Sequence, residues 1–187
     1  MSAPEPATRL DGCAMEIVEL AALRAGARDL RAIAISLGAA LPPPGRAAIS
    51  AGQLALCVRP ERWLLLGPPA PAGATAGIWQ AACEGCGAAI ERSSALVALQ
   101  LAGPAAREVL ARSCRLDLDL DAFPPGSAAA TIMGQVSVIL AALPSGLLLL
   151  TPSSTARHFR EWLRCAAQPF GLAPPSELSF AALTGDP

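Results

Sequence analysis

The sequence contains no lysine, no tyrosine and no asparagine, and its only histidine is His158. All 14 basic residues are arginines, and 15 acidic residues leave a formal net charge of −1. A nucleic-acid-binding protein needs an excess of basic side chains to displace counterions from phosphates, so this charge argues against that class. A Ser-His-Asp triad would depend on His158, and no Gly-x-Ser-x-Gly segment is present to expose a nucleophilic serine.

Phosphate-binding loops are also absent from the sequence. Neither the Gly-x-Gly-x-x-Gly pattern of dinucleotide-binding folds nor the Gly-x-x-x-x-Gly-Lys-Ser/Thr pattern of nucleotide-binding loops occurs. In those motifs the glycines let backbone N–H groups approach a phosphate at the start of a helix. We therefore expect this chain to have no catalytic residues and to bind no cofactor of its own.

Long apolar runs are rare, and the only one that resembles a membrane span is 132–150. Pro144, Ser145 and Gly146 interrupt it, which is typical of a turn between two buried strands. The first residues have neither the basic nor the apolar region of a secretory signal. The sequence thus predicts a cytoplasmic protein with no membrane span, a flexible lead at 1–24 and a loose tail at 173–187.

Six cysteines are present, and only Cys83 and Cys86 have the spacing of a metal or redox pair. A structural zinc site needs a second such pair or histidine ligands, and the sequence supplies neither. The pair also falls at the predicted end of a helix, where the helix dipole does not lower a thiol pKa. We therefore expect no bound metal, and we interpret the cysteines as small, partly buried side chains.

An acidic segment resembles the start of a calcium-binding loop. Asp117, Asp119 and Asp121 alternate along it, as the first ligands of such a loop do. However, Ala122 and Ala128 stand where the loop needs glycine and glutamate. We interpret the segment as an alternating strand or a turn with solvated carboxylates.

Three further polar positions are weighed as candidate sites. His158 is expected on the flank of a surface helix, partly in solvent. The turn Arg59-Pro-Glu-Arg62 is interpreted as a salt-bridged hairpin tip rather than a contact site. The segment Glu91–Ser94 lies between two apolar strands, and it fits an ordinary strand junction as well as a polar site within the sheet.

Strands and helices are interspersed along the chain. Periodicity predicts strands at 30–36, 53–58, 63–67, 88–92, 94–101, 128–133, 135–142 and 147–151. Helices are predicted at 74–84, from Pro104 to about 114, and after Pro152, where Phe159, Trp162, Leu163 and Ala166 share one face. This mixture predicts an α+β fold.

Two stretches about 84 residues apart resemble each other. In each, two strands form a hairpin, a proline follows the second strand, and a helix with one tryptophan returns (Trp79 and Trp162). A unit with one helix for three or four strands needs another layer to cover its sheet. We therefore expect two similar sheet-plus-helix halves, at 25–93 and 94–172, that pack together.

Three segments carry a family resemblance. The first is the hairpin Leu56-Cys-Val-Arg-Pro-Glu-Arg-Trp-Leu-Leu-Leu-Gly-Pro68. The second is Gly103-Pro-Ala-Ala-Arg107 followed by Cys114-Arg-Leu-Asp-Leu118, and the third is Phe123-Pro-Pro-Gly126. In order and spacing, over roughly 25–170, these resemble the gamma subunit of heterotetrameric sarcosine oxidase, although Arg115 stands where that family usually has proline.

The resemblance implies an aminomethyltransferase-like, folate-binding-type fold, because the Gly-Pro-x-Ala-Arg pattern also occurs in that superfamily. It implies a non-catalytic accessory subunit of a complex that oxidises sarcosine or a related N-methyl amine in folate-linked one-carbon metabolism. The partners would be alpha- and beta-type subunits, which would carry FAD, FMN, NAD and tetrahydrofolate. We expect the interface to use exposed apolar positions more than salt bridges.

The alternative is a stand-alone folate-binding aminomethyltransferase-like protein. Members of that superfamily are much longer and use a carboxylate near the folate. In this sequence, Glu91 is the only plausible positional match for that carboxylate.

Overall fold

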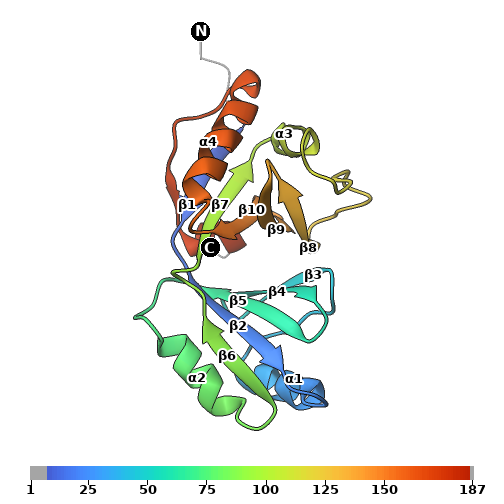
Figure 1. Ribbon diagram of the computed structural model, residues 1–187, viewed down its shortest axis with the longest axis vertical. Helices are drawn as coiled ribbons and strands as arrows, with labels where there is room; N and C mark the ends of the chain where they lie inside the picture. Colours follow the sequence, from blue (N-terminus) through green and yellow to red (C-terminus); the bar gives the residue numbers. More distant parts are fainter. Residues whose placement is uncertain (1–7, 186–187) are drawn as a thin grey trace.

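Two β-sheets lie face to face at the centre of the protein, and helices cover the outer side of each sheet (Figure 1). The computed structural model describes residues 8–185. The α+β fold expected from the sequence is present, in four layers of helices, sheet, sheet and helices. Most central strands are therefore buried on both faces, which explains their nearly continuous apolar runs.

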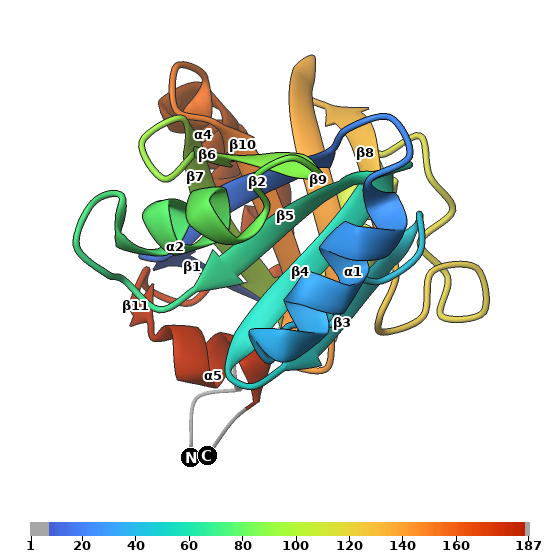
Figure 2. The same ribbon diagram turned by 90° about the horizontal axis from the view of Figure 1, so that it is seen from below.

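The first sheet has five strands in the order β3-β4-β5-β2-β6. The elements of this half are β2 (Glu16–Ala22), α1 (Ala27–Ser36), β3 (Arg46–Ser50), β4 (Gln53–Arg59), β5 (Arg62–Gly67), α2 (Ala74–Ala82) and β6 (Gly87–Glu91). Figure 2 shows α1 and α2 on the outer face of this sheet. Leu30 of α1 and Trp79 of α2 belong to one buried cluster with Trp63 of β5, so the helices are held by apolar packing.

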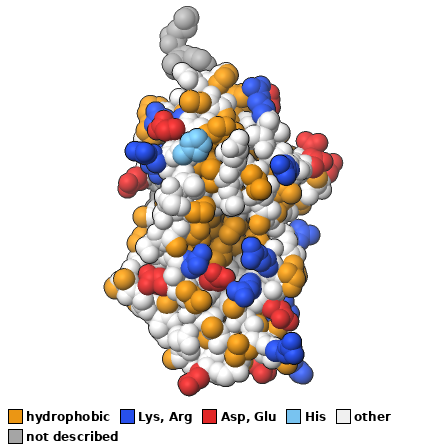
Figure 3. Space-filling view, viewed as in Figure 1, with side chains coloured by type: hydrophobic (Ala, Val, Ile, Leu, Met, Phe, Trp, Pro, Cys, Tyr) orange, Lys and Arg blue, Asp and Glu red, His pale blue; other side chains and the backbone are white. Residues whose placement is uncertain are grey.

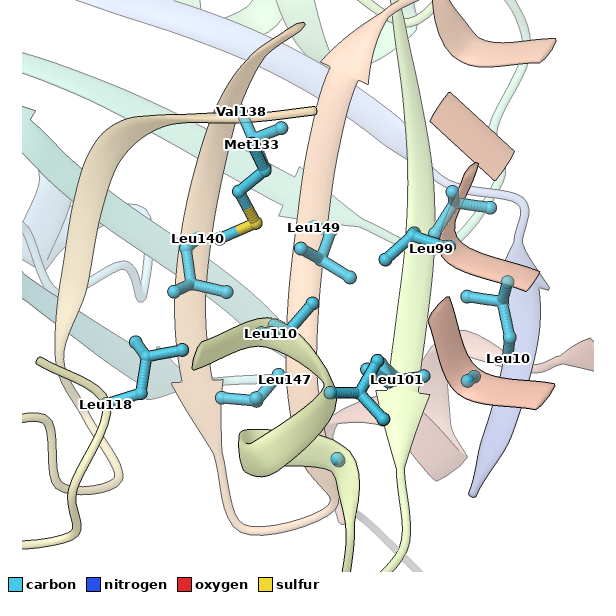
Figure 4. Close-up of a cluster of buried hydrophobic side chains, with 14 of the residues drawn as sticks. Leu10, Leu99, Leu101, Leu110, Leu118, Met133, Val138, Leu140, Leu147 and Leu149 are labelled. Carbon is cyan, nitrogen blue, oxygen red and sulfur yellow. The ribbon is translucent and has the colours of Figure 1, made fainter. Parts of the chain in front are cut away.

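The second sheet has six strands in the order β11-β1-β7-β10-β9-β8. Its elements are β1 (Arg9–Cys13), β7 (Leu96–Ala102), α3 (Ala106–Ala111), β8 (Ala128–Met133), β9 (Val136–Leu143), β10 (Gly146–Pro152), α4 (Ala156–Ala167), the short 3-10 helix Gln168–Phe170 and β11 (Glu177–Leu178). Figure 4 shows the leucine-rich cluster between this sheet and its helices. Phe159 and Leu163 of α4 are fully buried in that cluster and Trp162 is half-buried, which confirms the predicted apolar face.

The inner faces of the two sheets form a third apolar cluster. The first sheet contributes Ile17, Leu54, Leu56, Leu64 and Leu66, and the second contributes Ala98, Ala128, Ala141, Leu143, Leu148 and Leu150. Large side chains on one sheet therefore meet several alanines on the other. At one edge the sheets also join through an antiparallel bridge between Arg46 of β3 and Ser127, just before β8.

Both ends of the described chain belong to the sheets, which corrects the predicted lead (1–24) and tail (173–187). Strand β1 lies in the second sheet and β2 in the first, whereas residues 1–7 and 186–187 lie outside the described residues. In the tail, β11 pairs with β1, and α5 (Phe180–Thr184) buries Phe180 in the core between the sheets. Strand β2 lies between β5 and β6, and burial of both its faces removes the alternation that marks a strand in a sequence.

Helix α1 stands where the sequence analysis expected a strand at 30–36. Leu30, Ile33 and Ala34 also have helical spacing, and Leu30 and Ala34 are the side chains that α1 buries. A short alanine-rich segment fits both periods, and packing on the sheet selects the helix. Gly26 permits the close approach before the helix, because a Cβ atom there would lie 2.0 Å from the Cys86 carbonyl oxygen.

Most of the other predicted elements are confirmed, with shifted ends. The prolines expected to open two helices precede them instead, since Pro104 lies in the turn before α3 and Pro152 ends β10. The segment 117–121 forms a turn and bends rather than a strand. The hairpins β4–β5 and β9–β10 lie where the turn residues predicted them.

Both sheets are built by the same order of elements. In the first, β2, α1, β3, β4, β5 and α2 follow one another, and in the second, β7, α3, β8, β9, β10 and α4 do so. The neighbours in space match too, as β3-β4-β5-β2 and β8-β9-β10-β7. Beside β2 lies β6, which follows α2, whereas β1 from the start of the chain takes the corresponding place beside β7. Strand β1 therefore belongs to the second sheet, although the chain continues directly from it into β2 of the first sheet.

Replacing Trp63 tests the packing of the first half. Trp63 is 1% exposed, its indole N–H donates to the Pro42 carbonyl oxygen at 2.8 Å, and the Arg31 guanidinium lies 5.4 Å from the ring centre. We expect Trp63→Ala to lower the free energy of unfolding by about 3–5 kcal/mol. Urea denaturation measures the change. Trp162→Ala is the control and should cost less, because Trp162 is only half-buried, where it stacks on Phe159. Equal urea midpoints for Trp63→Ala and the parent would contradict the packing described.

Candidate functional site

A cleft of about 590 Å³ opens at one end of the space between the two sheets. We call it the central cleft; its walls come from the β4–β5 hairpin, β2, β7, β8, β9 and β10, and from Arg92 between the two halves. Figure 3 shows hydrophobic side chains gathered in a hollow at mid-height of the molecule, with basic and acidic side chains along its lower edge. It is the largest of the cavities formed by residues 8–185 that we describe.

The strand register explains why the cleft begins where it does. Residues two apart on a strand share a face, so Ile17 and Glu19 of β2 both point between the sheets. Glu19 is opposite Leu64, and Ala21, the next residue on this face, is opposite Arg62. The inner face of the first sheet thus changes from apolar to charged along β2 and β5, and the contact between the sheets ends there.

Charged side chains form the rim of the cleft on the first sheet. The Arg62 guanidinium lies 3.3 Å from one oxygen of Glu19, and Arg92 Nε lies 3.7 Å from the other. These side chains are 54%, 24% and 41% exposed in the order Arg62, Glu19, Arg92, so the pairs contribute little stability. Arg59 also lines the cleft and has no ion pair among the described residues. Three guanidinium groups therefore face one carboxylate.

The opposite wall is mostly apolar. It consists of inner-face residues of the second sheet, including Ala130, Ile132, Ile139 and Leu150. Ile132 is 46% exposed beside these apolar residues, and Ser137, its partner on β9, is a polar residue of the same wall. Among the described lining residues, the only carboxylate is Glu19, which two arginines already pair, and there is no histidine or cysteine. The lining of the cleft thus offers apolar contact and positive charge.

The segment Glu91–Ser94 combines both interpretations left open by the sequence. Its backbone and Ser93 act as a junction, since Arg92 N–H donates to Ile17 C=O at 2.7 Å and Ser93 Oγ accepts from Ile17 N–H at 3.0 Å. Arg92 itself reaches the central cleft. Glu91 instead lines a separate cavity of about 430 Å³ with Glu16 and Cys13, so the proposed match for a folate carboxylate lies outside the central cleft.

The cysteine pair lies where the sequence predicted, at the end of α2. Cys83 follows the last helical residue, and Cys86 Sγ donates to the Cys83 carbonyl oxygen at 3.4 Å. Burial raises the pKa of the Cys83 thiol, which opposes thiolate formation. Within residues 8–185, no group of three or more His, Cys, Asp or Glu side chains is arranged to hold a metal ion. The absence of zinc stays a prediction.

The acidic segment is a solvated turn rather than a calcium-binding loop, and the histidine lies on the surface of a helix, as the sequence analysis expected. The side chains of Asp117, Asp119 and Asp121 are exposed in a turn, and Asp119 N–H donates to Asp117 Oδ1 at 3.0 Å. His158 is exposed on α4. The Arg59–Arg62 turn is a hairpin tip as predicted, with Glu61 at φ +60°, but Arg62 pairs with Glu19 rather than Glu61.

Sequence reasoning missed two residues of the cleft, Glu19 and Ile132. Glu19 lies on a strand that was assigned to the flexible lead. A single acidic residue within the apolar run 17–22 was the available signal, because burial of an isolated carboxylate is costly unless a basic partner is near. For Ile132 the sequence offered no signal, since its exposure depends on where the first sheet ends.

The motif Gly103-Pro-Ala-Ala-Arg107 has a structural explanation. Arg107 Nη1 donates to the carbonyl oxygens of Leu118 and Phe123, the latter at 3.0 Å. Both acceptors belong to the loop between α3 and β8. One guanidinium therefore fixes the segment that contains Cys-Arg-Leu-Asp-Leu and Phe-Pro-Pro-Gly, so the second and third segments of the sequence resemblance form one structural unit.

Comparison with known proteins gives the family. The family model described as "Sarcosine oxidase, gamma subunit family" matches residues 24–168, which is more than half of the chain. The chain belongs to the sarcosine oxidase gamma subunit family. The match extends from just before α1 to the end of α4, and it includes Arg107 and the loop that Arg107 fixes. No match is found among curated proteins.

Solved structures agree with this assignment to the gamma subunit family. A chain of the heterotetrameric sarcosine oxidase from Corynebacterium sp. U-96, in complex with pyrrole 2-carboxylate, is 28% identical with a TM-score of 0.79, over 92% of this chain and 89% of that chain. Aminomethyltransferase T of the glycine cleavage system from Bartonella henselae is 19% identical with a TM-score of 0.61, over 85% of this chain and 46% of that chain. The second likeness shows the fold alone, which is aminomethyltransferase-like.

No helix within residues 8–185 is long and apolar enough to cross a membrane.

Removing the Arg107 guanidinium tests the role assigned to the family motif. We expect Arg107→Ala to lower the free energy of unfolding by about 2–4 kcal/mol, because hydrogen bonds from a charged donor contribute about 1.5–3 kcal/mol each. Protease cleavage within 114–126 should also become faster. Arg115→Ala, in the same loop but exposed, is the control and should behave like the parent. An Arg107→Ala variant with the parent's urea midpoint and cleavage rate would show that the loop does not depend on Arg107.

Alkaline pH should destabilise the protein through its buried thiols. Burial raises the pKa of Cys13 from 9.0 to about 11, and it raises the pKa of Cys57 and Cys83 in the same direction. The unfolded chain ionises these thiols first, so their stabilising effect is complete below about pH 9 and is lost as the pH rises towards about 11. We expect the urea midpoint to fall over this interval, and to fall less in Cys13→Ala than in the exposed-cysteine control Cys165→Ala. Equal falls of the urea midpoint in the two variants would contradict the assignment of this pH dependence to Cys13.

Proposed function

We propose that this chain is the accessory gamma-type subunit of a heterotetrameric sarcosine oxidase or a related N-methyl amine oxidase. The observation that carries this proposal is the family match over 24–168. The 28% identical chain of a heterotetrameric sarcosine oxidase supports it, because each chain covers about nine-tenths of the other. The partners would be the alpha- and beta-type subunits of the complex, in the cytoplasm.

The proposed role within the complex is non-catalytic. FAD, FMN, NAD and tetrahydrofolate would be held by the partner subunits, and none by this chain. Two observations support this division. The sequence has no glycine-rich phosphate loop, and the described lining of the central cleft has one carboxylate that is already paired with two arginines. The chain would contribute surface and structure to the oxidase rather than reacting groups.

We also infer that the two halves are copies of one unit. Their elements follow the same order, and their strands have equivalent neighbours in space. The likeness to aminomethyltransferase T covers 46% of that chain, so the chain spans about half the length of that enzyme.

Assembly with the oxidase is the test of the proposed function. Co-expression with the flavin-bearing alpha- and beta-type subunits of a sarcosine oxidase, followed by size-exclusion chromatography, should give one complex that contains all of them. The isolated chain should be colourless and inactive toward sarcosine, with or without tetrahydrofolate. The outcome that would contradict the proposal is elution of this chain alone while the other subunits form an active, flavin-loaded enzyme.

A further inference from the structure

We propose that the central cleft is the docking groove for an acidic, apolar chain segment of one partner subunit of the oxidase. This inference rests on the proposed function and adds the place of contact and the chemistry of the segment. It is drawn from three features of the cleft: an apolar wall without a cover, an excess of positive charge at the rim, and polar groups that lie in solvent.

The uncovered wall is the inner face of the second sheet. Over most of its length this face packs on leucines of the first sheet, but beyond Leu64 the first sheet presents Glu19 and Arg62 instead. Ile132 and Ile139 line the cleft on the uncovered part, and Ile132 is 46% exposed. An apolar surface with a polar rim is typical of a site of protein association.

The rim sets the charge of the segment that fits. Arg59, Arg62 and Arg92 line the cleft together with one carboxylate, Glu19, which leaves an excess of positive charge. Arg59 has no ion pair among residues 8–185. Arg92 Nε is buried without a hydrogen-bond partner, since Glu19 is 3.7 Å away. Carboxylates on the incoming segment would pair with the exposed guanidinium groups, above all with that of Arg59, and charges at a rim mainly raise the association rate and fix orientation.

The exposure of the arginines favours a chain segment over a small anion. The Arg62 and Arg92 side chains are 54% and 41% exposed, so a free carboxylate would bind them largely in water. A protein segment instead excludes that water with its own apolar side chains, which strengthens each charge pair. The cleft volume of about 590 Å³ has room for several side chains.

A competition experiment in the assembled oxidase tests the docking groove. Two differently tagged copies of the chain, the parent and a variant, are co-expressed with the oxidase subunits, and their ratio in the purified complex is measured by mass spectrometry. We expect the share of Arg59→Glu and of Ile132→Asp to fall at least about fivefold. The matched controls Arg28→Glu on α1 and Ile78→Asp on α2 change exposed side chains on the outer layer and should stay near parity.

Each outcome has a separate meaning. If Arg59→Glu and Ile132→Asp enter the complex as often as the parent chain, the docking groove is wrong although the parent chain assembles. If the parent chain itself does not assemble, the proposed function is wrong. The urea midpoint of the isolated Arg59→Glu variant should match the parent's, because the Arg59 side chain is exposed. If Ile132→Asp does not fold, the share of Arg59→Glu in the complex decides alone whether the docking groove is correct.

Photo-crosslinking identifies the occupant. A benzophenone side chain introduced at Ala130, which is exposed on the apolar wall, should crosslink in the complex to a partner-subunit peptide with at least one Asp or Glu among apolar residues. Two results would overturn the proposal. One is a crosslink to Leu116–Asp121 of a second copy of this chain, because that segment itself combines aspartates with apolar residues. The other is no crosslink, together with a rise in the melting temperature of the isolated chain in millimolar glutarate or phosphate, which would indicate a small-anion site.

Discussion

The packing of the two sheets through their inner faces is the interaction on which the rest of the structure depends. Each sheet is apolar on both faces, and its helices cover only the outer one. Neither half could bury its inner face alone, so the halves stabilise each other. Alanines at 98, 128 and 141 on one sheet leave room for the leucines of the other, and Phe180 of α5 closes the same cluster.

The same constraint determines where the protein can bind a partner. The sheets stay in contact only while both inner faces are apolar, and β2 and β5 change to Glu19 and Arg62 within two residues. Beyond Glu19 and Arg62, no apolar side chains among the described residues of the first sheet cover the apolar face of the second sheet. A cleft with one charged and one mostly apolar wall is the direct result.

Arg107 of the family motif has a structural role. Arg107 fixes the loop between α3 and β8 through two backbone carbonyls, and that loop leads to Ser127, which joins the two sheets at Arg46. The sequence resemblance thus followed a structural unit. The cysteine pair, the aspartates at 117–121 and His158 lie on separate elements and do not come together in the described structure.

The sequence by itself determined the local parts of this protein. Hairpins β4–β5 and β9–β10 and helices α2 and α4 could be predicted because their signals, turn residues and a 3.6-residue period, lie within a few residues of each other. Helix α1 could not, since a short alanine-rich segment fits both periods. Tertiary structure alone decided that β1 joins the second sheet and β2 the first. It also brought Glu19, Arg92 and Ile132 to one cleft, because strand pairing and the meeting of two faces depend on residues far apart in the chain.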